Sequence, residues 1–257
     1  GGGEGVHEDA ELAARRDGGG TDRSTLRPCR NGHLSLVRTS RPQAPGLLAK
    51  KKSFVAVERD TPAWRAYRRT FCAALTKVCA ERLVFIDESF CKTGMRREYG
   101  WSARGSRVAG KRPGRSWKTL SMIGAIRLGK RPTIMTNRGA VNGRVFLRFV
   151  RTRLVPNLSP GDIVVMDNLN FHKMVVVREA IAAAGATAIY LPTYSPELNP
   201  IELMWGDIKR RLRKLALDTE DQLVRAVRAI RAAMPFRKIE GWFRFSLREA
   251  RLKRSLL

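Results

Sequence analysis

The chain has 257 residues, enough for one main domain with a sizeable core, since domains typically take about 100–200 residues. Its 50 Lys and Arg against 23 Asp and Glu give a formal charge of +27, and the basic residues recur along the whole sequence. A field of that sign attracts polyanions, so we expect nucleic acid as the partner; a merely basic protein is the alternative.

The cysteines and the hydropathy of the chain indicate where in the cell the protein is located. Four cysteines without a C-x-x-C pair are too few for a disulfide scaffold, which fits a reducing cytoplasm. No apolar run approaches the roughly 18 residues of a membrane span, and the N-terminus lacks a signal-peptide pattern. We therefore expect a soluble cytoplasmic protein that makes no contact with a membrane.

The first 80 residues divide into two parts. Residues 1–48 are rich in Gly, Arg, Ser and Pro without a sustained apolar period, so they predict a disordered or degenerate segment. Residues 49–80 predict a lead-in helix, because Asp60-Thr61-Pro62 is typical of a helix start. Apolar residues follow it at helical spacing: Trp64, Tyr67, Phe71, Leu75 and Val78.

Residues 81–257 predict the main domain. The run "RLVFIDES" (82–89) favours a strand, glycines then punctuate the chain at hairpin-like intervals, and two more strands follow at 119–128 and 132–137. We expect these strands to pair antiparallel. The pattern then alternates between helix and strand, which favours parallel pairing, with helices at 142–158 and 172–185 and strands at 162–168 and 187–192.

Two helices complete the predicted domain. Apolar residues from Ile201 to Leu212 form one helix face, and "TEDQLVRAVRAIRAAM" (219–234) predicts a second helix. The resulting order β-β-β-α-β-α-β-α is the ribonuclease H-like arrangement. We therefore predict an α/β fold in which helices flank a mixed sheet.

Two predicted strands end in aspartate, Asp87 in "VFIDES" and Asp167 in "VVMDNL". In open α/β sheets, ligands bind beyond the carboxyl ends of the strands, so both side chains would face a site. Each aspartate alone could equally cap a turn or a helix. Two together favour a cation, because an unpaired buried carboxylate is costly and no Arg or Lys adjoins either strand interior.

The stretch "YSPELNPIELMW" (194–205) offers two candidates for a third acid. Glu197 lies between two prolines in a predicted loop, whereas Glu202 lies in the first turn of a helix whose apolar face must dock on the sheet. Position therefore favours Glu202. The alternative is that Glu202 only complements the helix dipole, which is worth less than about 1 kcal/mol.

Several motifs resemble one family. "IDES", "GDIVVMDNLNFHK" and "YSPELNPIELMW" resemble the catalytic blocks of DDE transposases of the bacterial branch of the Tc1/mariner superfamily, and the likeness extends over roughly residues 49–245. The 34 residues between Asp167 and Glu202 match the short second gap of that superfamily. The resemblance implies that Asp87, Asp167 and Glu202 are the catalytic triad.

The resemblance also implies the reaction. Mg²⁺ or Mn²⁺, as two ions held by the triad, would support cleavage of DNA by water and transfer of the freed 3′-hydroxyl strand into target DNA. Oxygen ligands suit Mg²⁺, and two such ions can activate the attacking oxygen and stabilise the leaving one. Asn168 could hold a metal-bound water without binding the metal itself. His172 could orient a water or a phosphate, or could equally have no role.

Full-length relatives carry helix-turn-helix modules that recognise the ends of the element, and residues 1–48 show no such pattern. We expect either a truncated copy or a separate upstream frame that supplies these modules. The resemblance implies transposon-end and target DNA as partners, a homodimer on DNA, and a place with the bacterial nucleoid. A ribonuclease H-like nuclease without transposition, and an inactive DNA-binding remnant, are the alternatives.

A basic segment between Met95 and Thr119 is the candidate DNA contact. Its cations are interleaved with Tyr99, Trp101 and Trp117, which suits a hairpin that grips a strand through phosphates and stacking; a solvated hairpin with core aromatics is the alternative. The stretch "KRRLRK" (209–214) extends this basic character. The candidate DNA-binding residues are Arg96, Arg97, Arg104, Arg107, Lys111, Arg112, Arg115, Lys118, Lys209 and Arg210.

Overall fold

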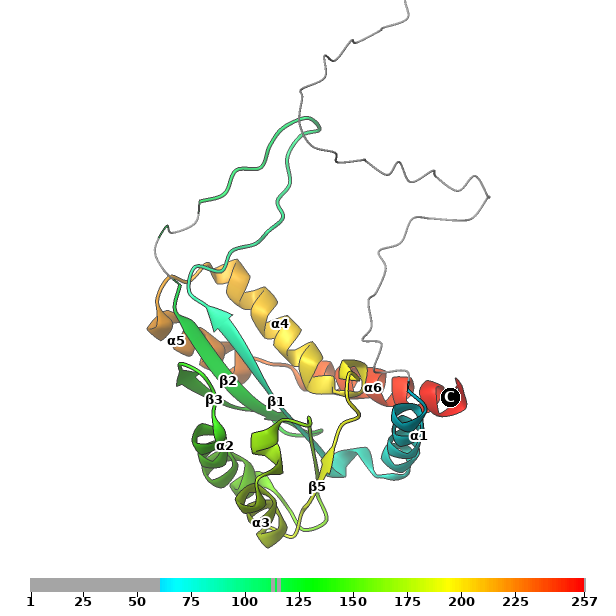
Figure 1. The fold of residues 1–257 in the computed structure, drawn as a ribbon. Helices are drawn as coiled ribbons and strands as arrows, with labels where there is room; N and C mark the ends of the chain where they lie inside the picture. The colour runs from blue at the N-terminus through cyan, green and yellow to red at the C-terminus, as the bar shows by residue number, and fades with distance from the viewer. Residues whose placement is uncertain (1–60, 112–113, 115–116, 257) are drawn as a thin grey trace, which may run out of the picture. The chain divides into compact units, whose positions relative to one another are not determined.

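A five-stranded sheet in the order β3-β2-β1-β4-β5 forms the centre of the fold (Figure 1). The structure, a computed structural model, describes residues 61–111, 114 and 117–256. The segment predicted over 1–48 and residues 49–60 of the predicted lead-in therefore lie outside the described residues. β1 pairs antiparallel with β2 and parallel with β4, as the sequence predicts for a mixed sheet. The strands are β1 (Leu83–Lys92), β2 (Thr119–Ile126), β3 (Thr133–Arg138), β4 (Ile163–Met166) and β5 (Thr187–Tyr190).

Helices cover both faces of the sheet, and alternation along the strands explains why. In β1, Leu83 and Phe85 pack in one hydrophobic cluster, whereas Val84 and Ile86 pack in another, because successive side chains point to opposite faces. The first face carries α1 (Pro62–Lys77), α4 (Pro200–Leu215), α5 (Glu220–Ala232) and α6 (Phe236–Leu256) (Figure 1). The second carries α2 (Gly143–Phe149), the turns Val150–Leu154 and Val155–Asn157, and α3 (Val175–Ala183).

Local capping explains where several helices begin. Thr61 accepts a hydrogen bond from the N–H of Trp64 and Pro62 opens α1, while Thr219 and Gln222 form a reciprocal capping box at the start of α5. Helix α6 was not predicted from the sequence, although Ile239 and Phe243 are buried one turn apart. Within the described residues, no helix is both long and apolar enough to cross a membrane.

Asp207 connects two of these helices. Its buried carboxylate, on α4, lies 2.7 Å from Lys238 Nζ on α6 and 2.9 Å from Arg211 Nε, and it also pairs with Arg210. Burial would raise the pKa of Asp207, but these cations hold it below its ordinary value. The network therefore ties the middle of α4 to the first turn of α6.

Two sequence predictions need correction. β1 continues to Lys92 instead of ending near residue 89, because its second half pairs with β2 through Lys92↔Thr119, so Asp87 lies within the strand. The predicted apolar face of α1 is also rotated: Arg68 and Cys72 are buried beside Phe71, whereas Trp64 is 36% exposed. Arg68 turns inward because its Nε donates to the buried Ser195 Oγ at 3.2 Å.

Candidate active site

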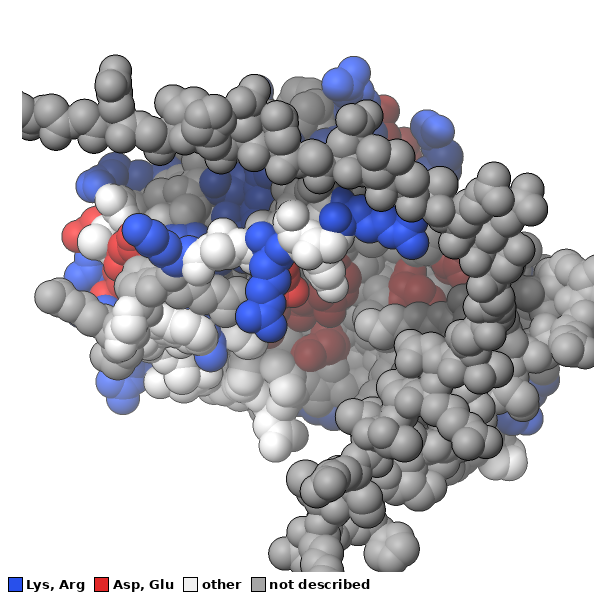
Figure 2. All heavy atoms as spheres, turned by 90° about the horizontal axis from the view of Figure 1, so that it is seen from above, with Lys and Arg blue, Asp and Glu red and all other residues white. Residues whose placement is uncertain are grey.

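Asp87, Asp167 and Glu202 line one cavity of about 360 Å³. Asp87 lies on β1 just beyond its parallel pairing with β4, which ends at the pair Phe85↔Val165. Asp167 follows the last residue of β4, and Glu202 lies in the first turn of α4. Figure 2 shows acidic atoms set back from the surface, with Lys and Arg side chains around them. The three carboxylates that the sequence singles out therefore face one space.

The strand period directs Asp87 toward α4. Asp87 lies two residues after Phe85 and so shares its face, where Trp205 Nε1 donates to Asp87 Oδ2 at 3.1 Å. Gly124 is the partner of Asp87 across β2, and a Cβ on Gly124 would come within 2.7 Å of the Trp205 ring. The absent side chain thus makes room for the indole that orients Asp87.

Burial and neighbouring carboxylates both act on the acids of the cavity. Burial, together with the charges of Glu202, Glu88 and Asp167, raises the pKa of Asp87 to about 8. Burial also raises the pKa of Glu202, with Lys209 opposing and Asp167 reinforcing the effect. Asn199 Oδ1 is buried and has no hydrogen-bond partner among the described residues. Such a set of oxygen atoms fits a hard divalent cation.

A second acidic residue, Glu88, enters the site from the opposite face of β1. His172 is fully buried in the turn Asn170–Lys173, with Nδ1 2.5 Å from Asp167 Oδ1 and Nε2 3.0 Å from Glu88 Oε1. Burial would lower the pKa of His172, but the hydrogen bonds and charges of the two carboxylates raise it to about 9. His172 therefore links the two acids as an imidazolium that donates to both.

The ligand atoms of Glu88, Asp167 and His172 all lie within 4.8 Å of one another, close enough for a divalent metal ion. Both ring nitrogens already face carboxylates, however, which favours a bridging imidazolium over a metal ligand. Sequence analysis missed Glu88. The signal was the period of two in "IDES", which places Asp87 and Glu88 on opposite faces of one strand.

The other sequence candidates near the cavity are placed as follows. Asn168 lines the cavity, and its Nδ2 donates to the backbone oxygen of Leu191 at 2.7 Å, which ties the end of β4 to the end of β5. Glu197 lies in the one-turn helix Pro196–Leu198, and the described residues that line the cavity do not include it. The structure thus separates the two glutamates of the 194–205 stretch.

The predicted basic segment is not a regular hairpin beyond the strands. Between Thr93 and Lys118 the described residues contain no strand, and Tyr99 and Trp101 are 89% and 102% exposed. Core packing of these aromatics, the alternative weighed above, is therefore wrong. Arg104, Arg107 and Lys111 are exposed, whereas Arg112 and Arg115 lie outside the described residues.

Four candidate cations have partners in the protein. Arg96 pairs with Asp218 at 2.7 Å, and Lys118 lies 3.8 Å from Glu220. Lys209 Nζ lies 5.2 Å from the centre of the Phe90 ring. Arg210 pairs with Asp207, as described above, and Arg97 is exposed next to Arg96. The candidates therefore include residues that hold the structure as well as residues that face solvent.

A mixed sheet of this order, with carboxylates gathered beyond its parallel strands, defines a ribonuclease H-like nuclease domain. The sequence model of the DDE superfamily endonucleases matches residues 82–224, and the chain belongs to that family. This finding confirms the family predicted from the motifs. Membership of the bacterial branch stays a prediction.

Solved structures agree on the fold. The Mos1 transposase paired-end complex with the left transposon end matches with a TM-score of 0.66 and 16% identity, over 82% of this chain and 67% of that one. The Mos1 strand transfer complex matches with a TM-score of 0.67 and 16% identity, over 82% and 66%. The catalytic domain of Mos1 mariner transposase matches with a TM-score of 0.57 and 13% identity, over 76% and 94%. A search of curated proteins finds no match.

Proposed function

We propose that this chain is the catalytic domain of a DNA transposase that cleaves phosphodiester bonds at the ends of an element and joins the freed 3′-hydroxyl strand to target DNA. The observation that carries the proposal is the cavity shared by Asp87, Asp167 and Glu202. Burial in this cavity, together with the charges of Glu202, Glu88 and Asp167, raises the pKa of Asp87, as expected where carboxylates crowd one space. The fold likeness to the Mos1 strand transfer complex supports the strand-transfer step.

We assign the three carboxylates as ligands of two Mg²⁺ or Mn²⁺ ions. The crowding of negative charge and the unpartnered Asn199 oxygen fit divalent cations, and Mos1 complexes with Mn and with Mg are known. When bound, such a pair supplies positive charge at the attacking and leaving oxygens of an in-line phosphoryl displacement. The protein's share is to hold each carboxylate in a fixed orientation.

Three side chains perform this positioning. Trp205 fixes Asp87 through its indole N–H, and His172 fixes Asp167 while its other nitrogen is held by Glu88. Asn168 keeps the ends of β4 and β5 together beneath the cavity. In this proposal His172 and Asn168 act through the carboxylates and the backbone, and a role of either side chain on a water or a phosphate stays a prediction.

The proposed partner is DNA at the element ends and at the target. The charge of +27 and the exposed cations and aromatics between β1 and β2 support binding through phosphates and stacked bases. We propose a homodimer on DNA, by analogy with the paired-end complex of Mos1. Helix-turn-helix modules for end recognition would come from a longer chain or from an upstream product, and the place of action would be the nucleoid.

Paired substitutions test the triad. Glu202→Gln keeps the shape of the side chain but removes its charge, so Mg²⁺-dependent cleavage of supercoiled DNA should fall by several orders of magnitude while DNA binding persists. Glu197→Gln is the matched control, and it should change cleavage by less than about tenfold, which is about 1.4 kcal/mol in barrier. Single-turnover assays on the chain, alone and joined to recognition modules, measure both rates.

The opposite pattern, with Glu197→Gln inactive and Glu202→Gln active, would overturn the assignment. Cleavage by the wild-type protein without joining of the 3′ end to a second duplex would instead support a nuclease that does not transpose. Strand joining is read directly as a branched product on a denaturing gel.

A further inference from the structure

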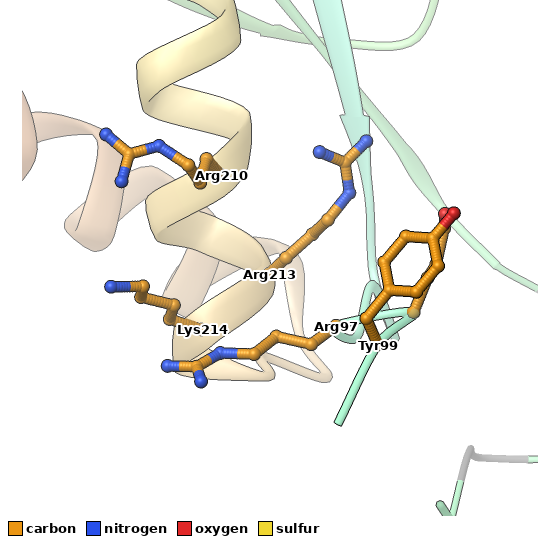
Figure 3. Close-up of a pocket in the computed structure, with 6 residues that line it drawn as sticks. Arg97, Tyr99, Arg210, Arg213 and Lys214 are labelled. Atoms are coloured by element: carbon orange, nitrogen blue, oxygen red, sulfur yellow. The ribbon is translucent and has the colours of Figure 1, made fainter. Parts of the chain in front are cut away.

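A second cavity, of about 380 Å³, lies at the far end of α4 from Glu202. It shares no lining residue with the acidic cavity. Figure 3 shows how the connection between β1 and β2 approaches the last turns of α4 to form it. The lining residues are Arg97, Glu98 and Tyr99 from the connection and Arg210, Arg213 and Lys214 from α4.

The two walls of this cavity are joined at their base. Arg96 Nη2 lies 2.7 Å from Asp218 Oδ1, just beyond the end of α4. The N–H of Gly94 donates to the backbone oxygen of Leu217 at 2.8 Å. Arg97 to Tyr99 follow these tethers directly along the chain, so they are held beside the helix end.

The chemistry of the cavity suits an anion with an attached ring. Four cations outnumber the one carboxylate, Glu98, so the site is net positive. The carboxyl end of a helix disfavours an anion, hence side chains and not the helix dipole must provide the attraction. Because Arg210 already pairs with Asp207, Arg97, Arg213 and Lys214 remain the main candidates for phosphate contacts.

Tyr99 supplies the complementary surface. The side chain is 89% exposed, so its ring face is open for stacking. Figure 3 shows its ring on the same side of α4 as the Arg213 guanidinium. An aromatic face beside several cations is the combination that holds single-stranded nucleic acid by base stacking and phosphate contact.

Size and position narrow the ligand further. A volume of about 380 Å³ lies at the low end of small-molecule pockets, about 300–1,000 Å³, which suits one nucleotide. Glu202 and Arg213 are eleven residues apart on α4, which is roughly 16 Å at 1.5 Å per residue. A strand that crosses the acidic cavity could therefore reach this pocket within a few nucleotides.

We propose that this pocket binds one unpaired nucleotide of the DNA strand near its cleavage site, with the base stacked on Tyr99 and the phosphate held by Arg97, Arg213 and Lys214. The proposal rests on the proposed function in that the ligand is DNA. Beyond that function, the proposal requires the DNA to be single-stranded next to the cleavage site. A duplex would have to open, or present an overhang, before the pocket is filled.

Photocrosslinking with an octathymidylate that carries one 5-iodouracil, in buffer without divalent metal, tests the pocket. The crosslink should map to Tyr99 by mass spectrometry, persist in Tyr99→Phe and disappear in Tyr99→Ala. Tyr99→Ala should weaken binding about 5- to 150-fold, the range for loss of one stacked base. The Arg213→Ala/Lys214→Ala variant should lower the salt slope of log affinity by about 0.7 for each lost contact.

Arg244→Ala, which removes an exposed cation from α6, is the matched control and should change affinity by less than about twofold. Crosslinks confined to Trp101 or Trp117, or equal crosslinking to duplex DNA, would overturn the proposal. So would normal affinity in Tyr99→Ala. Because the assay involves no cleavage, a failed transposase assignment leaves its result intact, and a failed pocket leaves the cleavage tests intact.

Discussion

Gly124→Ala probes the support beneath Asp87. A Cβ at this position would lie 2.7 Å from Trp205 Cη2 and 2.8 Å from Cζ2, whereas carbon atoms pack favourably at about 3.5–4.0 Å. The indole must therefore retreat by about 1 Å. Trp205 is 1% exposed, so neighbouring core residues must move with it.

Two opposing effects determine how much Gly124→Ala changes the free energy of unfolding. Overpacking of a core costs about 1–3 kcal/mol, while replacing Gly by Ala inside a strand recovers about 0.5–1 kcal/mol of chain entropy. We expect a net loss of about 1–2 kcal/mol, or roughly 2–8 °C in Tm for a domain of this size. Cleavage should fall by about 10²-fold, because Trp205 donates to Asp87 and a shift of about 1 Å has that effect on catalytic geometry.

Thermal unfolding and single-turnover cleavage at a temperature where the variant is folded measure the two effects separately. Gly206→Ala is the control, since a Cβ there meets no atom within 4 Å and Ala favours the helix by about 1 kcal/mol. A Gly124→Ala protein with wild-type cleavage and Tm would refute the role of this contact. Equal losses in both variants would show a general effect of alanine on α4 and its neighbours.

Three further predictions concern His172, Asp207 and the metal. His172→Gln should cost about 3–5 kcal/mol of stability, because Glu88 and Asp167 lose the buried imidazolium that they share. The same variant should lower kcat more than it changes KM. Glu88→Gln keeps a hydrogen-bond acceptor and should cleave within about tenfold of the wild-type rate. Asp207→Asn should lower the free energy of unfolding by about 2 kcal/mol in urea at pH 7. Because the folded pKa of Asp207 is lowered, its contribution to stability is complete above the unfolded pKa of about 4 and is lost as the pH falls through the folded pKa. A stability difference between variant and wild type that persists at pH 2 would contradict the role of these ion pairs. Mg²⁺ at ten times its Kd should stabilise the protein by about 1.4 kcal/mol in a thermal scan. Asp87→Asn should abolish this stabilisation. If the variant is stabilised as much as the wild type, the metal binds at a different site.

Sequence patterns predicted the strands and the three acids because those features are local. The runs before Asp87 and Asp167 are apolar and short, and the docking face after Pro200 separates Glu202 from Glu197. The assignment of catalytic and metal-binding roles stays a prediction. What the structure adds at these positions is a shared cavity and the pKa shifts that accompany it.

Other features depend on contacts between segments far apart in the chain. The pairing of Glu88 with His172 spans 84 residues and requires the turn Asn170–Lys173, which no periodicity reveals. The buried Arg68 likewise depends on Ser195. The glycines between residues 94 and 114 resembled hairpin punctuation, yet residues 101–111 are exposed and form no strand, so spacing alone did not predict their conformation.

The burial of Trp205 gives the protein an optical reporter at its proposed catalytic centre. Its indole is 1% exposed and bonded to Asp87, whereas Trp64, Trp101 and Trp117 are at least 36% exposed. A soluble quencher such as acrylamide should therefore quench those three tryptophans first, and in a Trp242→Phe variant, which removes the partly buried fifth tryptophan, the buried indole should dominate the remaining emission. Any cation that draws charge from the Asp87 carboxylate should shift that residual emission, so occupancy could be followed in solution without DNA or turnover.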